Sequence, residues 1–169
     1  MTRLLTLIAL ICTITHVGAC QSGPTTPGGG AIPVGETRPP ADFALAVTVM
    51  GEEGTTGWVL EPARFVIEPD GVLRAATGAG VGPTVYPPRT RRLTDLQVRE
   101  IHNIVTRQGL DRGVGGKAFR LGDVQPIGAW VLIEVTAHEQ RRSTIYRPED
   151  ERRVIELVRH LRRLARLEG

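Results

Sequence analysis

The sequence offers few of the side chains that enzymes use as nucleophiles or as metal ligands. Its 169 residues include two cysteines, two serines and four histidines. Nucleophilic catalysis needs a serine or cysteine held beside a base, and Ser143 is the only such residue after Ser22. No two histidines have the His-x-x-x-His spacing of a helical zinc site. We therefore predict no catalytic residue, no metal site and no cofactor, and we do not expect an enzyme.

Aromatic side chains and lysine are also scarce. Aromatic residues make up 4% of the chain, and Lys117 is the one lysine among 21 basic residues. The formal net charge is only +3. Proteins that bind single-stranded nucleic acids combine a basic groove with aromatic side chains on which bases stack. The composition therefore argues against a nucleic-acid partner, whereas 41% hydrophobic and 23% charged residues are typical of a globular domain.

The apolar segment at the N-terminus is too short to cross a membrane. It runs from Leu4 to Ile14 and follows Arg3, whereas a membrane-spanning helix needs ~20 apolar residues. A basic start, an apolar segment of this length and small residues before a cleavage point are typical of a secretory signal peptide. We predict a signal peptide over residues 1–19.

The residues that follow indicate a lipid anchor. Val17–Cys20 (VGAC) resembles the lipobox of bacterial lipoproteins, with valine where leucine is more common. The resemblance implies that the thiol of Cys20 carries a diacylglycerol, that the chain is cut before this residue, and that the new amine is acylated. Gln21 stands in place of the aspartate associated with inner-membrane retention, which favours the outer membrane where one exists. The alternative is an ordinary signal peptide cut after Ala19, with Cys20 left as a free thiol.

Residues 20–41 are rich in glycine, proline and threonine and have almost no large apolar side chains. Such a segment cannot bury enough apolar surface to offset the entropy lost on ordering. We therefore predict a disordered linker between the lipid-anchored cysteine and a single domain over residues 42–169.

The predicted domain is α+β: an antiparallel sheet of about five strands with two helices on one face, in the order β-β-β-α-β-β-α. Short apolar or alternating segments indicate the strands, and Glu68–Gly71 (EPDG) is typical of a tight turn between two of them. The strand over 130–136 is apolar on both faces, which places it in the centre of the sheet. The predicted strand segments are 42–50, 58–60 with 64–68, 72–76, 130–136 and 142–146.

The two helices are predicted from their end signals. Thr94 and Gln97 form a capping box at the start of a helix over 95–108, and Gly109 suits the left-handed position that follows it. For the second helix, Pro148 suits the first helical position and is followed by acidic residues that favour a helix start. We expect this helix to run to about residue 167.

Arginine gives the chain its most distinctive surface. Four arginines lie from position 159 onward, against a single glutamate, Glu168. One interpretation is a solvated helix face paired with acidic residues one turn away. The other is a docking patch for anionic lipids, glycans or an acidic protein. We also consider the loops 51–57 and 111–128 as contact surfaces. The patch consists of Arg159, Arg162, Arg163 and Arg166.

The order of elements also resembles that of emfourin-type inhibitors of metallopeptidases. The features shared are a sheet with an Asp-Gly turn, a helix opening at Leu93–Gln97, an apolar hairpin over 130–146 and a short closing helix. The resemblance implies a peptidase inhibitor that inserts a loop into a protease cleft. Our leading hypothesis is a non-enzymatic binding module anchored to the cell envelope, with the inhibitor as the alternative. An enzyme would require a pocket that gathers Asp42, His102 or Asp123.

Overall fold

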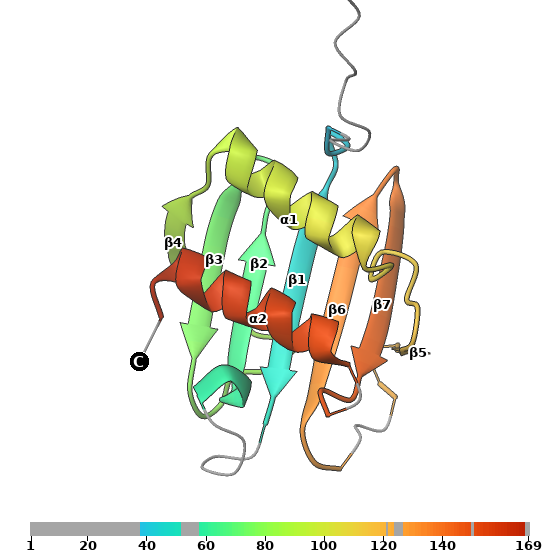
Figure 1. The fold of residues 1–169 in the computed structure, drawn as a ribbon. Coiled ribbons are helices and arrows are strands. Elements are labelled where there is room, and N and C mark those ends of the chain that lie inside the picture. The colour runs from blue at the N-terminus through green and yellow to red at the C-terminus, as the bar shows by residue number, and fades with distance from the viewer. Residues whose placement is uncertain (1–37, 52–57, 121, 124–126, 150, 168–169) are drawn as a thin grey trace, which may run out of the picture. The chain divides into compact units, whose positions relative to one another are not determined.

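The fold is built on one antiparallel sheet, covered on one side by helices (Figure 1). The computed structural model describes residues 38–51, 58–120, 122–123, 127–149 and 151–167. The predicted signal peptide, Cys20 and nearly all of the predicted linker lie outside these residues, so the structure does not bear on them. The described part of the chain belongs to one compact unit, Gly35–Gly169.

Within the described residues, seven strands pair in the order β4-β3-β2-β1-β6-β7-β5, and every pair is antiparallel. The elements in chain order are β1 (Ala44–Met50), the 3-10 turn η1 (Trp58–Leu60), β2 (Ala63–Ile67), β3 (Val72–Thr77), β4 (Arg89–Arg92), α1 (Asp95–Arg107), β5 (Lys117–Ala118), β6 (Trp130–Ala137), β7 (Gln140–Tyr146) and α2 (Arg152–Ala165). The predicted α+β class is therefore confirmed, as is the central place of β6 between β1 and β7.

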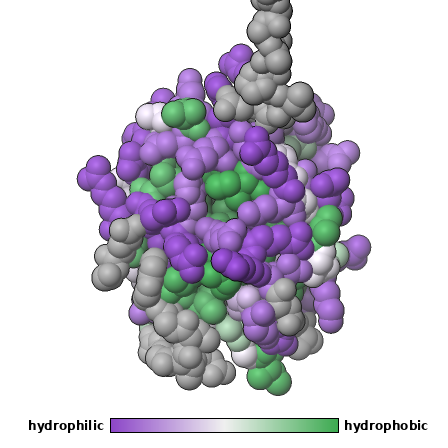
Figure 2. Space-filling view, in the orientation of Figure 1, coloured by the Kyte–Doolittle hydropathy of each residue, from purple (hydrophilic) through white to green (hydrophobic). Residues whose placement is uncertain are grey.

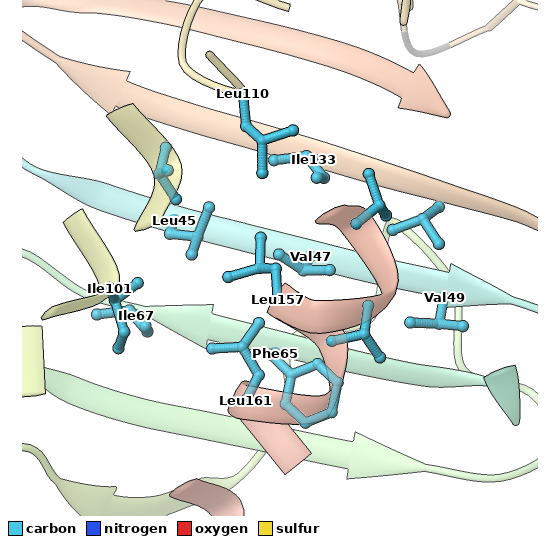
Figure 3. Packing of buried hydrophobic residues seen from close by; sticks show 14 of the residues in the cluster. Leu45, Val47, Val49, Phe65, Ile67, Ile101, Leu110, Ile133, Leu157 and Leu161 are labelled. Atoms are coloured by element: carbon cyan, nitrogen blue, oxygen red, sulfur yellow. The ribbon is translucent and has the colours of Figure 1, made fainter. Parts of the chain in front are cut away.

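The main core lies between the sheet and the two helices, which both cross the same face (Figure 1). In β1, Leu45, Val47 and Val49 alternate toward this face and are almost fully buried. Across the interface, Leu157 of α2 lies close to Val47, and Leu161 lies beside Phe65 of β2 (Figure 3). A single-sided helix layer thus follows from strands whose apolar residues alternate with a period of two.

The local signals of α1 are confirmed in detail. The Thr94 hydroxyl accepts a hydrogen bond from the N–H of Gln97, and the Gln97 side chain accepts one from the N–H of Thr94. Gly109 is left-handed with φ 69°, and the N–H of Leu110 donates to the carbonyl of Val105 at 2.9 Å. Together with the bond from Gly109 to the carbonyl of Thr106, this is a Schellman ending of the helix.

Two predicted elements are wrong. Residues 58–60 form η1 rather than a strand, because the carbonyl of Val59 accepts a hydrogen bond from Arg162 of α2 and not from a neighbouring strand. The helix α2 begins at Arg152 and not at Pro148, because the chain first turns from the sheet toward the helix layer. In that turn the N–H of Glu151 donates to the carbonyl of Pro148, and Arg153 binds the Glu151 carboxylate at 2.8 Å.

Two edge strands were not predicted. β4 is entirely polar and pairs with β3, while β5 has two residues and pairs with β7. Neither segment carries an alternating apolar pattern, since backbone pairing alone makes them strands. The described sheet therefore has seven strands and not about five.

The face of the sheet opposite the helices, here called the helix-free face, carries a second apolar cluster. It comprises Phe119, Trp130, Leu132 and Ile145, with Met50 packed against it. The rings of Phe119 and Trp130 lie 6.5 Å apart. This cluster packs over the part of the sheet where β5, β6 and β7 meet.

Candidate functional site

The predicted arginine patch on α2 is smaller in the structure than in the sequence. Arg159, Arg163 and Arg166 are exposed, but Arg162 is only 2% exposed. Its Nε donates to the carbonyl of Val59 at 3.2 Å and its Nη2 to the carbonyl of Glu61 at 2.6 Å. The inclusion of Arg162 in a docking patch is therefore wrong, because its side chain is occupied inside the fold, where burial lowers its pKa.

The remaining surface of α2 mixes both signs of charge. Arg152 pairs with Glu156 at 3.4 Å, one turn along the helix, and Arg163 approaches the ring of His160 at 3.4 Å. The helix layer is accordingly hydrophilic over most of its surface, with scattered apolar side chains (Figure 2). This arrangement favours the solvated-face interpretation, since exposed pairs of this kind contribute little energy.

A groove of about 880 Å³ runs round the edge of β7. By register, Leu132 and Glu134 of β6 lie on the helix-free face and Val135 lies on the helix face, and all three line the groove. Its lining therefore includes residues whose side chains lie on either face of the sheet at this edge. We call it the β7 groove. Its charged lining consists of Asp111, Arg112, Arg120, Glu134, Arg141 and Arg142.

Both acidic side chains of the groove are already engaged. Glu134 accepts from Arg141 at 2.6 Å and from the buried Arg64 at 3.4 Å. Arg64 also donates to the hydroxyl of Thr48, and its burial lowers its pKa against the opposing effect of Glu134. Oδ1 of Asp111 lies 3.8 Å from Nε of Arg112. The carboxylates therefore position arginines and leave the groove with a cationic surplus.

Two arginines of the groove have no acidic partner among the residues that the structure describes. Arg120 and Arg142 are both exposed, and across the described ranges no ion pair reaches either guanidinium. Arg120 extends from the segment after β5, and Arg142 projects from β7. Such guanidinium groups offer donors that suit carboxylates. This is the part of the groove that is open to an anionic ligand.

The end of the groove is shaped by a strained turn. β6 and β7 are joined by His138 and Glu139, which both have positive φ (53° and 61°), as a two-residue type I′ hairpin requires. The Asp42 carboxylate accepts the N–H of Glu139 at 2.6 Å and that of His138 at 3.0 Å. These hydrogen bonds, that of Glu139 foremost, lower the pKa of Asp42. The start of the domain thereby fixes the hairpin whose second strand lines the groove.

The residues considered for catalysis do not assemble there. None of Asp42, His102 and Asp123 lines the β7 groove. His102 is buried with its ring edge-on to Phe43 at 5.0 Å, and burial lowers its pKa, while Asp123 accepts the N–H of Arg120 at 2.8 Å. Ser143 lines the groove, but no hydrogen bond joins it to a histidine in the part of the chain described.

The described residues offer neither a metal-binding cluster nor a membrane-spanning helix. No group of three or more histidine, cysteine, aspartate or glutamate side chains in this part is arranged to hold a metal ion. No helix within the same ranges has both the length and the apolar character needed to span a bilayer.

No protein-family model matches this chain, and no curated protein matches it in sequence. The site therefore rests on its own geometry. Sequence reasoning named the loop over 111–128 as a contact surface, which supplies Arg112 and Arg120, but it missed Arg141 and Arg142. Two successive arginines on a strand point to opposite faces, and only the free edge of β7 places both in one groove.

Proposed function

We propose that this chain is a lipid-anchored protein of a bacterial cell envelope whose domain binds an acidic partner in the β7 groove without catalysing a reaction. The observation that carries the binding site is the pair Arg120 and Arg142, which line one groove without an acidic partner in the described ranges. The anchor rests on the sequence Val17–Cys20 and its resemblance to a lipobox. Acyl chains contribute ~0.8 kcal/mol per buried methylene, so several chains hold a protein on a membrane almost permanently.

The anchor is tested with a fatty acid carrying an alkyne, fed to bacteria that express the full chain. We expect the label on the wild type and in the membrane fraction. Cys20→Ser abolishes both, whereas Cys12→Ser, the matched control, leaves both unchanged because this residue precedes the cleavage point. A bare thiol at Cys20 in the mass spectrum, with the protein free of the membrane, contradicts the anchor.

The groove is tested with fluorescein-labelled poly-L-glutamate and the purified chain, by fluorescence anisotropy. We expect the double variant Arg120→Ala with Arg142→Ala to bind about tenfold or more weakly, since two charge-assisted contacts are lost. The control is Arg159→Ala with Arg163→Ala, which removes the same charge from α2 and changes affinity by less than about twofold. Added salt weakens wild-type binding. Equal losses in both double variants mean that binding is non-specific, and the groove proposal is then wrong.

A further inference from the structure

The β7 groove contains a stretch of strand edge that no described residue pairs with. The two-residue turn at His138 and Glu139 makes Ala137 and Gln140 a hydrogen-bonded pair. Because the pattern alternates along an antiparallel ladder, Arg141 and Ser143 turn their backbone groups away from β6. The bond from the N–H of Phe119 to the carbonyl of Ser143, at 2.9 Å, agrees with this direction.

The neighbouring strand covers only part of that edge. β5 pairs with β7 at two positions, Lys117 with Ile145 and Ala118 with Thr144. Beyond Phe119 the chain turns away, because the N–H of Arg120 donates to the Asp123 carboxylate at 2.8 Å and the N–H of Asp123 donates to the carbonyl of Arg120 at 2.9 Å.

Three outward backbone groups remain beside the groove. They are the N–H of Ser143, the N–H of Arg141 and the C=O of Arg141. On that side the two N–H groups donate to no described residue and the C=O accepts from none. Unpaired edge groups of this kind are a template for pairing with another extended chain. From Arg141 to Ser143 the open edge is about 7 Å long, at ~3.3 Å per residue.

We propose that the β7 groove takes an extended acidic peptide segment of its partner, which adds to the sheet as a strand beside Arg141 and Ser143. This inference rests on the proposed function and specifies the partner. The main-chain groups of β7 supply affinity, as in other complexes formed by strand addition. The incoming segment continues the line of β5 where that strand leaves the edge.

The charges of the groove match an acidic strand on both of its faces. Side chains of an added strand alternate between the two faces of the sheet. Arg141 stands on the helix-free face, where it meets Glu134, and Arg142 stands on the helix face. Arg120 and Arg112 line the same groove. In a segment with carboxylates at successive positions, the carboxylates on the helix-free face therefore lie near Arg141 and those on the helix face lie near Arg142.

A polyanionic sugar or a lipid headgroup satisfies the arginines but offers no peptide N–H to the carbonyl of Arg141. A peptide satisfies both the guanidinium groups and the strand edge. The combination of charge and unpaired backbone in one groove is what selects the peptide.

The experiment compares three octaglutamate probes bound to the purified full chain. One is unmodified, one is N-methylated at alternate residues, and one is N-methylated at every residue. The alternately methylated peptide keeps one face of N–H groups for the edge and is expected to bind within about threefold of the unmodified one. The fully methylated peptide can neither donate to nor closely approach the edge, and we expect it to bind about tenfold or more weakly. All three carry the same charge.

Hydrogen exchange supplies a second measurement. We expect the amides of Arg141 and Ser143 to exchange more slowly when unmodified octaglutamate is bound. The amides of Arg142 and Thr144 face β6 and serve as internal controls, because they are already paired within the hairpin.

Each outcome decides a different claim. Equal binding of all three probes, still dependent on Arg120 and Arg142, overturns strand addition and leaves the proposed anion-binding function standing. Binding that ignores both arginines overturns the proposed function as well. Vesicles containing phosphatidylglycerol that bind through these arginines, while no octaglutamate binds, overturn the peptide in favour of a lipid surface.

Discussion

Replacing Arg162 with methionine tests whether this arginine belongs to the core or to the surface. The substitution removes the guanidinium and keeps most of the aliphatic volume. In the structure the side chain is 2% exposed and donates to the carbonyls of Val59 and Glu61. It thereby joins η1 and the residue after it to the last turn of α2, across more than a hundred residues of sequence.

The expected cost follows from these two bonds. A hydrogen bond from a charged group contributes about 1.5–3 kcal/mol, and a buried carbonyl left without a donor costs about 1–3 kcal/mol. The desolvation of the guanidinium opposes this gain, as its lowered pKa indicates. We therefore expect Arg162→Met to reduce the free energy of unfolding by about 2–4 kcal/mol, a large part of the 5–15 kcal/mol typical of a domain.

The assay is urea unfolding of the purified chain, followed by circular dichroism. With a slope of roughly 2 kcal/mol per molar urea, the midpoint falls by roughly 1–2 M. Arg159→Met is the control, because it changes an exposed arginine on the same helix and alters stability by less than about 0.5 kcal/mol. If both variants unfold at the same midpoint, Arg162 is a surface residue and the packing described above is wrong.

Three further predictions concern the backbone and pH. Arg166 ends α2 in the left-handed region with φ 57°. Arg166→Gly therefore raises the free energy of unfolding in urea by about 0.5–1 kcal/mol, whereas Arg166→Ala, with the same loss of charge, does not. Gly109→Ala lowers stability by about 1–2 kcal/mol, because this glycine is left-handed at φ 69° with Val114 close by, whereas Gly82→Ala, in open space, changes little. The pKa of Asp42 is lowered in the folded protein from its ordinary value of 3.8. The carboxylate therefore stabilises the fold fully above pH 3.8, and this stabilisation is lost as the pH falls below 3.8. In acid titrations monitored by circular dichroism, wild type therefore loses stability below that pH more steeply than Asp42→Asn.

Each of these three predictions has an outcome that would contradict it. A destabilised Arg166→Gly means that the arginine side chain itself holds the end of α2. An unchanged Gly109→Ala means that the ending of α1 tolerates a right-handed residue. Parallel acid profiles for the two forms at position 42 mean that the carboxylate does not hold the β6–β7 turn.

Short-range signals in the sequence were reliable where one segment contains all of its own determinants. The turn at Glu68–Gly71 closes with a 2.8 Å bond from the N–H of Gly71 to the carbonyl of Glu68, and Gly71 has the positive φ expected of it. The capping box at Thr94 and the left-handed Gly109 are similar cases. In each, backbone geometry is set by residues within one turn of the chain.

Predictions failed where the deciding partner was distant. Residues 58–60 have an apolar sequence that suits a strand, but Arg162 binds the carbonyl of Val59 there and the segment is a 3-10 turn. Position 162 itself was assigned to the surface because arginine is seldom buried. Arg162 is nevertheless buried, because it lies on the inner side of α2 with Leu161 and Ala165 and finds backbone carbonyls there that accept its hydrogen bonds.

The sequence by itself determined the α+β class, the ends of α1 and the face of β1 that is buried. These properties depend on periodicity and on neighbouring residues. The tertiary structure decided which arginines line one groove, because Arg112 and Arg120 come from a loop, Arg141 and Arg142 come from a strand, and the pairing of β5 with β7 brings the loop and the strand together. A free strand edge is likewise a property of the assembled sheet, since it exists only where the next strand ends too early.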